Sequence, residues 1–173
     1  MTLALISVYN TKPPEKEMYE RQLFGLLAER EPYQNISHKK MPTYEQHESF
    51  VQNKPYKGWY VIYKEGDFVG SIYLSKENNI GLFIRKCHVG EGYGKLALKE
   101  LINQHPQEEY FANIAPFNSN SIAFFMNFGF KYYGMQHDEY GNLVQYEFKY
   151  TNPLIDLSKA ETLIETNQTA PQT

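Results

Sequence analysis

The chain has 173 residues, the size of one ordinary domain, with 42% hydrophobic residues, 21% charged residues and 15 tyrosines. The aromatic content excludes a disordered chain, and the net charge of −3 argues against a protein that coats nucleic-acid phosphates. No apolar run is long enough to span a membrane, and the single cysteine, Cys87, excludes an internal disulfide and a multi-cysteine metal site. We therefore expect a protein of the reducing cytoplasm, with no nucleic-acid or membrane partner and no metal.

The first half of the chain predicts one strand, two helices and three further strands. Pro13-Pro14 ends the first apolar run and opens a helix, because proline is tolerated in a first helical turn. Met18, Leu23, Leu26 and Leu27 mark its apolar stripe. Thr43 with Gln46 has the spacing of a capping box. The expected ranges are a strand over 2–9, helices over 13–29 and 43–52, and strands over 59–64, 68–75 and 79–85.

The second half predicts a helix over 93–104, a strand over 109–115, a helix over 118–128 and a hairpin of strands over 130–135 and 143–149. Consecutive strands without intervening helices favour antiparallel pairing, whereas the strand–helix–strand crossover at 79–115 favours one parallel pair. The expected fold class is therefore α/β, with a mixed, mostly antiparallel sheet flanked by helices.

Residues 1–150 are expected to form the one folded domain, because the aromatic residues stop at Tyr150. The C-terminal extension, 151–173, has capping-box spacing at Ser158 and Glu161, which predicts a short helix at 154–165. Its polar end, 166–173, is predicted to be disordered.

Three glycines punctuate the loop between the strand at 79–85 and the helix at 93–104: Gly90, Gly92 and Gly94. Glycine allows positive φ and close approach of a ligand, and backbone amides at a helix start attract phosphate. The alternative is a plain turn in which the glycines only permit packing. Neither the P-loop spacing nor the Rossmann spacing is matched, since Lys95 stands where the Rossmann motif needs its third glycine.

Two motifs, in order and at close spacing, resemble those of the GCN5-related N-acetyltransferase superfamily, which transfers acetyl groups from acetyl-CoA. The loop Val89-x-x-Gly92-x-Gly94 is similar to the first motif. The segment Asn118-x-x-Ser121-x-x-Phe124-Phe125-x-x-x-Gly129-Phe130 is similar to the second. The resemblance covers about residues 1–150 and implies that the parallel strand pair splays apart to hold the pantetheine arm.

The resemblance also implies a set of residues that bind acetyl-CoA. Backbone groups of Leu82, Phe83 and Ile84 would contact the pantetheine arm and polarise the thioester carbonyl, and Asn118 would bond the amide arm or the sulfur end. The implied binding residues are Leu82, Phe83, Ile84, Val89, Gly90, Glu91, Gly92, Tyr93, Gly94, Lys95, Asn118 and Phe125.

The sequence departs from the family pattern at three positions. Val89 replaces the usual Gln or Arg of the loop, which removes a side-chain contact to phosphate. Phe125 replaces a Tyr that can protonate the leaving thiolate, and Asn113 replaces the Glu that members acting on ribosomal proteins use as a base. The catalytic residues therefore remain unassigned; His47 and Tyr73 are candidates, each with core packing as its alternative role.

The acceptor is expected to be a primary amine of a small molecule, with an amino sugar as one candidate. Lys39 and Lys40, in the basic run 36–43, are positioned to meet an anionic acceptor, although a solvated loop is the simpler explanation. A protein or peptide N-terminal acetyltransferase is the alternative enzyme, and a non-catalytic acyl-CoA-binding module is the alternative of another class. Cys87 is expected to be a small buried residue, and a homodimer is compatible with the sequence.

Overall fold

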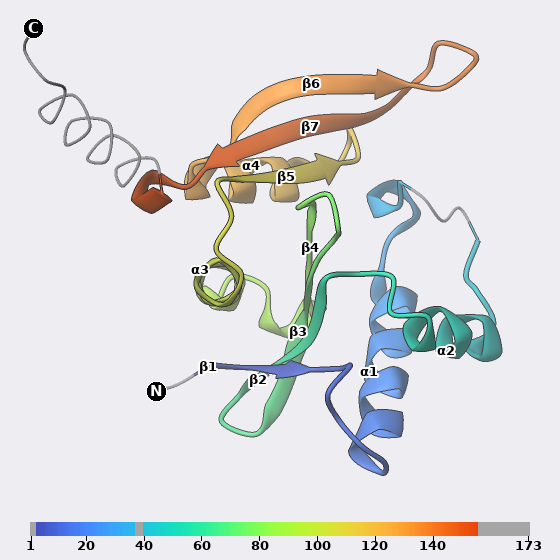
Figure 1. The fold of residues 1–173 in the computed structure, drawn as a ribbon. Coiled ribbons are helices and arrows are strands. Elements are labelled where there is room, and N and C mark those ends of the chain that lie inside the picture. Colours follow the sequence, from blue (N-terminus) through green and yellow to red (C-terminus); the bar gives the residue numbers. More distant parts are fainter. Residues whose placement is uncertain (1–2, 37–39, 156–173) are drawn as a thin grey trace, which may run out of the picture.

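A computed structural model describes residues 3–36 and 40–155 (Figure 1). Its strands form two antiparallel sheets, ordered β1-β2-β3-β4 and β5-β7-β6. The strands are β1 (Leu3–Ser7), β2 (Gly58–Lys64), β3 (Asp67–Leu74), β4 (Ile80–Ile84), β5 (Glu109–Ile114), β6 (Lys131–His137) and β7 (Leu143–Thr151). The helices are α1 (Glu15–Glu29), α2 (Tyr44–Gln52), α3 (Tyr93–Gln104) and α4 (Ser119–Phe128), with one-turn 3-10 helices at Pro32–Gln34 and Lys86–His88.

The predicted capping box is present, and a tight turn joins β2 to β3. Thr43 accepts a hydrogen bond from the Gln46 amide at 3.2 Å, and Gln46 Oε1 accepts one from the Thr43 amide, which starts α2 at Tyr44. Glu65 and Gly66 have φ values of 52° and 92°, and positive φ at both central residues is what a type I′ hairpin turn requires. This turn pairs Lys64 with Asp67 and sets the register of β2 against β3.

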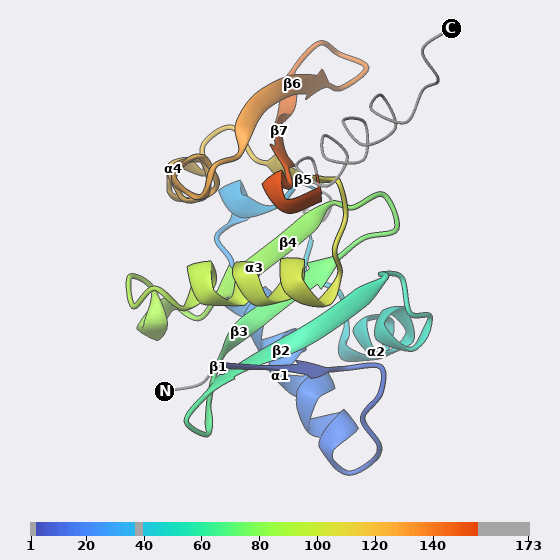
Figure 2. The same ribbon diagram turned by 60° about the vertical axis from the view of Figure 1, so that its left-hand side comes forward.

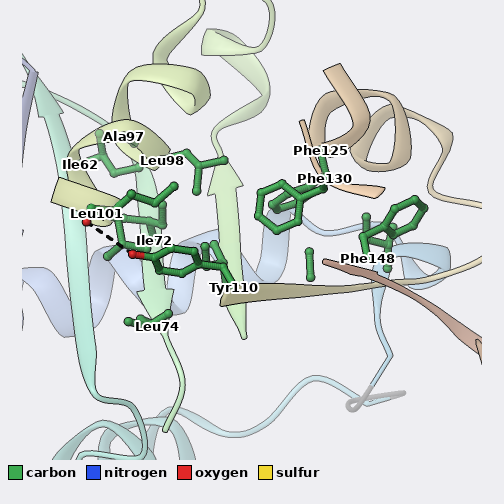
Figure 3. Packing of buried hydrophobic residues seen from close by; sticks show 14 of the residues in the cluster. Ile62, Ile72, Leu74, Ala97, Leu98, Leu101, Tyr110, Phe125, Phe130 and Phe148 are labelled. Carbon is green, nitrogen blue, oxygen red and sulfur yellow. Dashed lines mark hydrogen bonds between the residues drawn. The ribbon is translucent and has the colours of Figure 1, made fainter. Parts of the chain in front are cut away.

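The first sheet has α3 on one face and α1 and α2 on the other (Figures 1 and 2). A hydrophobic cluster lies on each face. Because side chains alternate along β2, Trp59 and Val61 face α1 and α2, whereas Ile62 belongs to the cluster beneath α3. Figure 3 shows Leu98 and Leu101 of α3 packed over that strand layer, with Tyr110 between the two sheets. Tyr110 is fully buried, and its hydroxyl donates to the His105 carbonyl at 2.7 Å.

The two sheets meet along β4 and β5, which run parallel but touch at only one bridge. Asn79 pairs with Phe111, and the Phe111 amide donates to the Asn78 carbonyl at 2.9 Å. Beyond that bridge the strands diverge, and β4 has no further strand partner on that side among the described residues. The expected parallel pair is therefore one bridge wide and splayed, and the fold is a mixed α/β fold with antiparallel sheets.

Some sequence-based expectations differ from the structure or fall outside it. Met18, predicted in the apolar stripe of α1, is 44% exposed, because only Tyr19, Leu23 and Leu26 turn toward the core beside the buried Glu20. Cys87 is exposed rather than buried, because it lies in the 3-10 turn outside both clusters. Of the predicted helix at 154–165 only the first residues are described; the remainder, the tail 166–173 and Lys39 lie outside the described residues.

Candidate active site

Two adjoining cavities lie where β4 and β5 diverge. One has a volume of about 820 Å³ and is walled by α1, α2, β3 and β4; the other, of about 430 Å³, lies between β4, α4 and the loop before α3. They share the lining residues Gln34, Leu82, Phe83, Asn118, Ser121 and Phe125. Because they share these residues, the two cavities adjoin each other at the open edge of β4.

The smaller cavity contains the glycine loop. Gly90 and Gly92 have φ values of 92° and 81°, and a Cβ at either position would meet no atom within 4 Å, so these glycines serve the backbone conformation and face open space. Gly92 is the N-cap of α3 and supplies no side-chain acceptor to the first amides of the helix. Those unsatisfied amides and the helix dipole form a site suited to a diphosphate.

The other loop residues have different roles from one another. Gly94 is buried, and a Cβ there would lie 3.2 Å from the Phe124 ring and 3.3 Å from Leu82, so it permits close packing of α3 against β4 and α4. Val89 is 65% exposed and lines the cavity. Glu91 does not line it: its carboxylate lies 3.4 Å from His88 Nδ1, and its amide already donates to the His88 carbonyl.

The open edge of β4 presents the backbone of Leu82 and Ile84. The Arg85 amide bonds the Val69 carbonyl on β3 at 2.9 Å, so odd-numbered backbone groups of β4 point toward β3. Accordingly the Phe83 carbonyl lies next to Gly70, 2.2 Å from the position that a Cβ would take. The expected backbone contact to a pantetheine arm is therefore available at Leu82 and Ile84 but not at Phe83, which offers its ring instead.

Asn118 and Phe125 bring α4 to the junction of the two cavities. The Asn118 side-chain oxygen caps the helix by accepting from the Ser121 amide at 3.2 Å, so its amide group is the part left for a ligand. Phe125 is buried against Phe124 and Phe130, at ring-centroid distances of 5.2 and 5.0 Å. The smaller cavity is thus lined by every residue proposed to bind acetyl-CoA except Glu91: Leu82, Phe83, Ile84, Val89, Gly90, Gly92, Tyr93, Gly94, Lys95, Asn118 and Phe125.

An aromatic frame lines the larger cavity. The rings of Tyr56 and Tyr73 are stacked, with centroids 3.9 Å apart and planes 5° apart. Trp59 meets the Tyr56 ring edge-on at 5.0 Å, and its indole nitrogen donates to Ser71 Oγ at 2.9 Å. Burial, followed by the neighbouring Tyr73, raises the pKa of Tyr56, so that hydroxyl stays protonated at neutral pH.

His47 borders the same cavity but is held as a structural residue. Its exposed fraction is 3%, and Nε2 lies 3.0 Å from the Glu20 carbonyl, so this nitrogen carries the proton and ties α2 to α1. Burial lowers the pKa of His47, with the bond to Glu20 acting against that shift. The neutral ring, flanked by Phe24 at 5.5 Å, fits the packing alternative better than the general-base role.

Sequence reasoning missed one of the two cationic residues that line this cavity, Arg30, and the aromatic pair of Tyr56 with Trp59. Arg30 stands between two glutamates at the end of α1, a pattern typical of a solvated surface, and nothing in its spacing points inward. The pattern around Trp59 predicts a strand but does not indicate a cavity wall. No sequence periodicity could link Arg30 to Tyr56 and Trp59, because they come from separate segments that only the tertiary fold brings together.

The chemistry of the larger cavity is defined by what lines it. None of its described lining residues is Asp or Glu, and its cationic lining residues are Arg30 and Lys40. Asn113, from β5, lines it where a family member with a carboxylate base would have Glu. Within residues 3–36 and 40–155 there is no group of three His, Cys, Asp or Glu side chains placed to hold a metal ion, and no helix long and apolar enough to cross a membrane.

Solved structures share this fold at low sequence identity. An N-acetyltransferase from Staphylococcus aureus is 16% identical, with a TM-score of 0.62 over 87% of this chain and 99% of that one. A ribosomal-protein-alanine N-acetyltransferase from Brucella melitensis is 16% identical (TM-score 0.64, 88% and 100% covered), and an acetyltransferase from Thermus thermophilus is 21% identical (0.63, 88% and 98%).

Sequence comparison places the chain in a family without assigning its substrate. No curated protein matches the sequence. The family model described as Acetyltransferase (GNAT) family matches residues 18–130, which is more than half of the chain and includes the central elements of both cavities, β4, α3 and α4. The two motifs, the splayed strands and this match agree: the chain belongs to the GNAT acetyltransferase family.

Proposed function

We propose that this protein is an acetyl-CoA-dependent N-acetyltransferase that acts on a primary amine of a small molecule. The observation that carries the proposal is the pair of joined cavities, one suited to a diphosphate and one lined by aromatic rings. The larger, at about 820 Å³, falls within the range of about 300–1,000 Å³ usual for small-molecule sites. We also place the activity in the cytoplasm, where an exposed single thiol such as Cys87 stays reduced.

The residues of the smaller cavity fit acetyl-CoA. The first amides of α3 and the open space over Gly90 and Gly92 would receive the diphosphate, and the free edge of β4 at Leu82 and Ile84 would pair with the pantetheine arm. Glu29, the one carboxylate on this cavity's wall among the described residues, is bound by Arg85 and the Lys86 amide, so its charge is offset. When bound, acetyl-CoA supplies an activated acetyl group as a thioester.

The protein's contribution to transfer is positioning and stabilisation of charge. The lone pair of a neutral amine attacks the thioester carbonyl carbon and forms a C–N bond. The C–S bond breaks to release the coenzyme A thiolate, and the proton lost from the amine passes to solvent. A Leu82 or Ile84 amide on the open edge of β4 is placed to donate to the carbonyl oxygen as negative charge develops there. Because the described lining of the larger cavity holds no carboxylate, no protein base is assigned, and orientation supplies much of the rate.

Two measurements test the proposal in sequence. Calorimetry with coenzyme A should show saturable binding to the purified protein. An amine panel incubated with acetyl-CoA should then release thiol and give an N-acetylated product that mass spectrometry detects. Binding without product for any amine would favour an acyl-CoA-binding module, and acetylation of peptides alone would favour an N-terminal acetyltransferase. Absence of coenzyme A binding would refute the proposal.

A further inference from the structure

Arg30 lies in the wall of the larger cavity and has no carboxylate partner among the described residues. It is the C-cap of α1, and its side chain is half-buried, with Nε shielded from solvent and without a hydrogen-bond partner. Its guanidinium carbon lies 5.3 Å from the centroid of the Phe83 ring on β4. A buried donor left without a hydrogen-bond partner lowers stability, and more so when the group is charged, so its presence in this wall calls for an explanation.

The carboxylates nearest to Arg30 in sequence are committed to other cations. Glu29 Oε1 lies 3.2 Å from Arg85 Nε, and its other oxygen accepts from the Lys86 amide at 3.0 Å. Glu31 Oε1 lies 2.6 Å from Lys86 Nζ. The local acidic groups therefore tie α1 to the turn after β4 and leave Arg30 free to face the cavity.

The surroundings of Arg30 offer no internal anion. None of the described residues lining the larger cavity is Asp or Glu. Burial lowers the pKa of the Arg30 guanidinium, with the neighbouring Tyr73 and Tyr56 acting against that shift. Lys40, the other cation of the lining, is exposed at the rim and adds charge of the same sign. The cavity thus presents a fixed positive charge inside an aromatic frame.

We propose that the acceptor amine carries an oxyanion, a carboxylate or a phosphate, that Arg30 binds. This inference rests on the proposed acetyltransferase function and names the acceptor class. The planar guanidinium matches either anion with two parallel hydrogen bonds, which an ammonium group cannot do. Phe83 supports the guanidinium from one side, and the same strand presents Leu82 to the acetyl group, so one β-strand relates the anion site to the reaction site.

The frame also predicts the rest of the acceptor. Phe50 meets the Trp59 and Tyr56 rings edge-on at 6.0 and 5.9 Å, so the aromatic wall extends from Tyr73 to the surface of α2. A cationic acceptor such as a polyamine would meet Arg30 and Lys40 with like charge. An amine with one anionic group and a flat or apolar body can pair with Arg30 and pack against the aromatic rings.

The test uses two matched pairs of probes with saturating coenzyme A: phenylalanine against phenylalaninamide, and glucosamine 6-phosphate against glucosamine. The single tryptophan, Trp59, lies in the cavity wall, so its fluorescence reports binding without turnover. We expect the anionic member of at least one pair to bind roughly ten- to a hundredfold tighter, the value of a charge-assisted hydrogen bond. The pair that responds distinguishes a carboxylate from a phosphate acceptor.

Arg30→Gln should abolish this preference, Arg30→Lys should retain only part of it, and Arg21→Gln should leave it intact, because Arg21 is exposed on the same helix. All three should bind coenzyme A like the wild type, which separates failure of this inference from failure of the proposed function. Arg30→Met should also unfold at an unchanged or higher temperature, since it removes an unpaired charge; a structural ion pair would give the opposite. Equal binding of neutral and anionic probes, or a preference that survives Arg30→Gln, would overturn the inference.

Discussion

The ring of Tyr73 lies directly over Gly81, its partner across β3 and β4. A Cβ built on Gly81 would lie 2.0 Å from Tyr73 Cζ, so only glycine at this position allows the ring to lie flat against the sheet. In that position the ring stacks on Tyr56, at a centroid distance of 3.9 Å. One glycine on the strand beside the reaction site therefore holds the aromatic frame of the larger cavity.

Replacing Gly81 by alanine should displace Tyr73 and disrupt the stack. Overpacking of this kind costs about 1–3 kcal/mol, and we expect urea denaturation to show that loss. Amine acetylation should fall, while coenzyme A affinity should hold because the glycine loop is unchanged. Gly25→Ala is the matched control: Gly25 is exposed in α1 with no atom near its Cβ position, so alanine there should stabilise by about 0.5–1 kcal/mol. Equal stability of the two variants would contradict this assignment.

The diphosphate site can be tested by charge alone at Gly92. Asp and Asn have the same shape and meet the same strain at φ 81°, and a side chain at Gly92 would enter open space. Gly92→Asp adds a negative charge beside the first amides of α3, so calorimetry should show coenzyme A binding weakened by roughly tenfold or more relative to Gly92→Asn. Equal affinity of the two variants would place the diphosphate elsewhere.

Gly94 is a poor substitute for that test, although it belongs to the same motif. Its Cβ position lies 3.2 Å from the Phe124 ring, so any side chain there strains the packing of α3. Loss of binding in a Gly94 variant would not separate charge repulsion from local distortion. The sequence motif does not distinguish the two glycines, but a side chain at Gly92 would enter open space and one at Gly94 would contact Phe124.

Local patterns in the sequence predict most of the secondary structure. The helix expected at 93–104 and the capping box at Thr43 agree with the structure, because periodicity and capping act within a few residues. The splay of β4 from β5 follows from the family resemblance and not from any local pattern. The prediction for Met18 is wrong because the apolar face of α1 is narrower than its sequence indicates, with Glu20 buried on it.

The acceptor side of the site could not be read from the sequence in the same way. Arg30 is followed by Glu31 and preceded by Glu29, and the pairing of those glutamates with Arg85 and Lys86 spans more than fifty residues. Only the tertiary fold shows which of these charges remains unpaired. The same holds for His47, whose bond to the Glu20 carbonyl favours packing over catalysis.

Stability should depend on pH through His47. Burial holds the folded-state pKa of His47 below 6.5, so the unfolded chain binds its proton first as the pH falls. The contribution of the neutral His47 ring to protein stability is full above about pH 6.5 and is lost as the pH falls through the folded-state pKa. Urea midpoints should therefore drop between about pH 7.5 and 5.5.

His47→Gln should reduce that drop, because glutamine can still donate to the Glu20 carbonyl but does not titrate. Burial raises the pKa of Glu20, so the contribution of Glu20 to protein stability falls as the pH rises. The quantity to compare is therefore the difference in urea midpoint between wild type and variant at each pH. His137→Gln, at an exposed position on β6, is the control. A His47→Gln protein with the wild-type pH slope would show that His47 is not the group responsible.

Ser71 should stabilise the cavity wall through one buried hydrogen bond. Trp59 Nε1 donates to Ser71 Oγ at 2.9 Å, and both residues are buried in the first sheet. Ser71→Ala leaves the indole N–H without its acceptor, which should cost about 1–3 kcal/mol in urea denaturation. The Trp59 emission maximum should shift as the ring loses its fixed position.

A double-mutant cycle separates the hydrogen bond from packing. Trp59→Phe removes the donor while keeping a ring, so Ser71→Ala in that background should cost clearly less than in the wild type. Denaturation of the variants that carry Trp59→Phe is followed by circular dichroism, since the single tryptophan is then absent. If the two substitutions prove additive, the loss arises from packing around Ser71, and the hydrogen bond contributes little to the position of the aromatic wall.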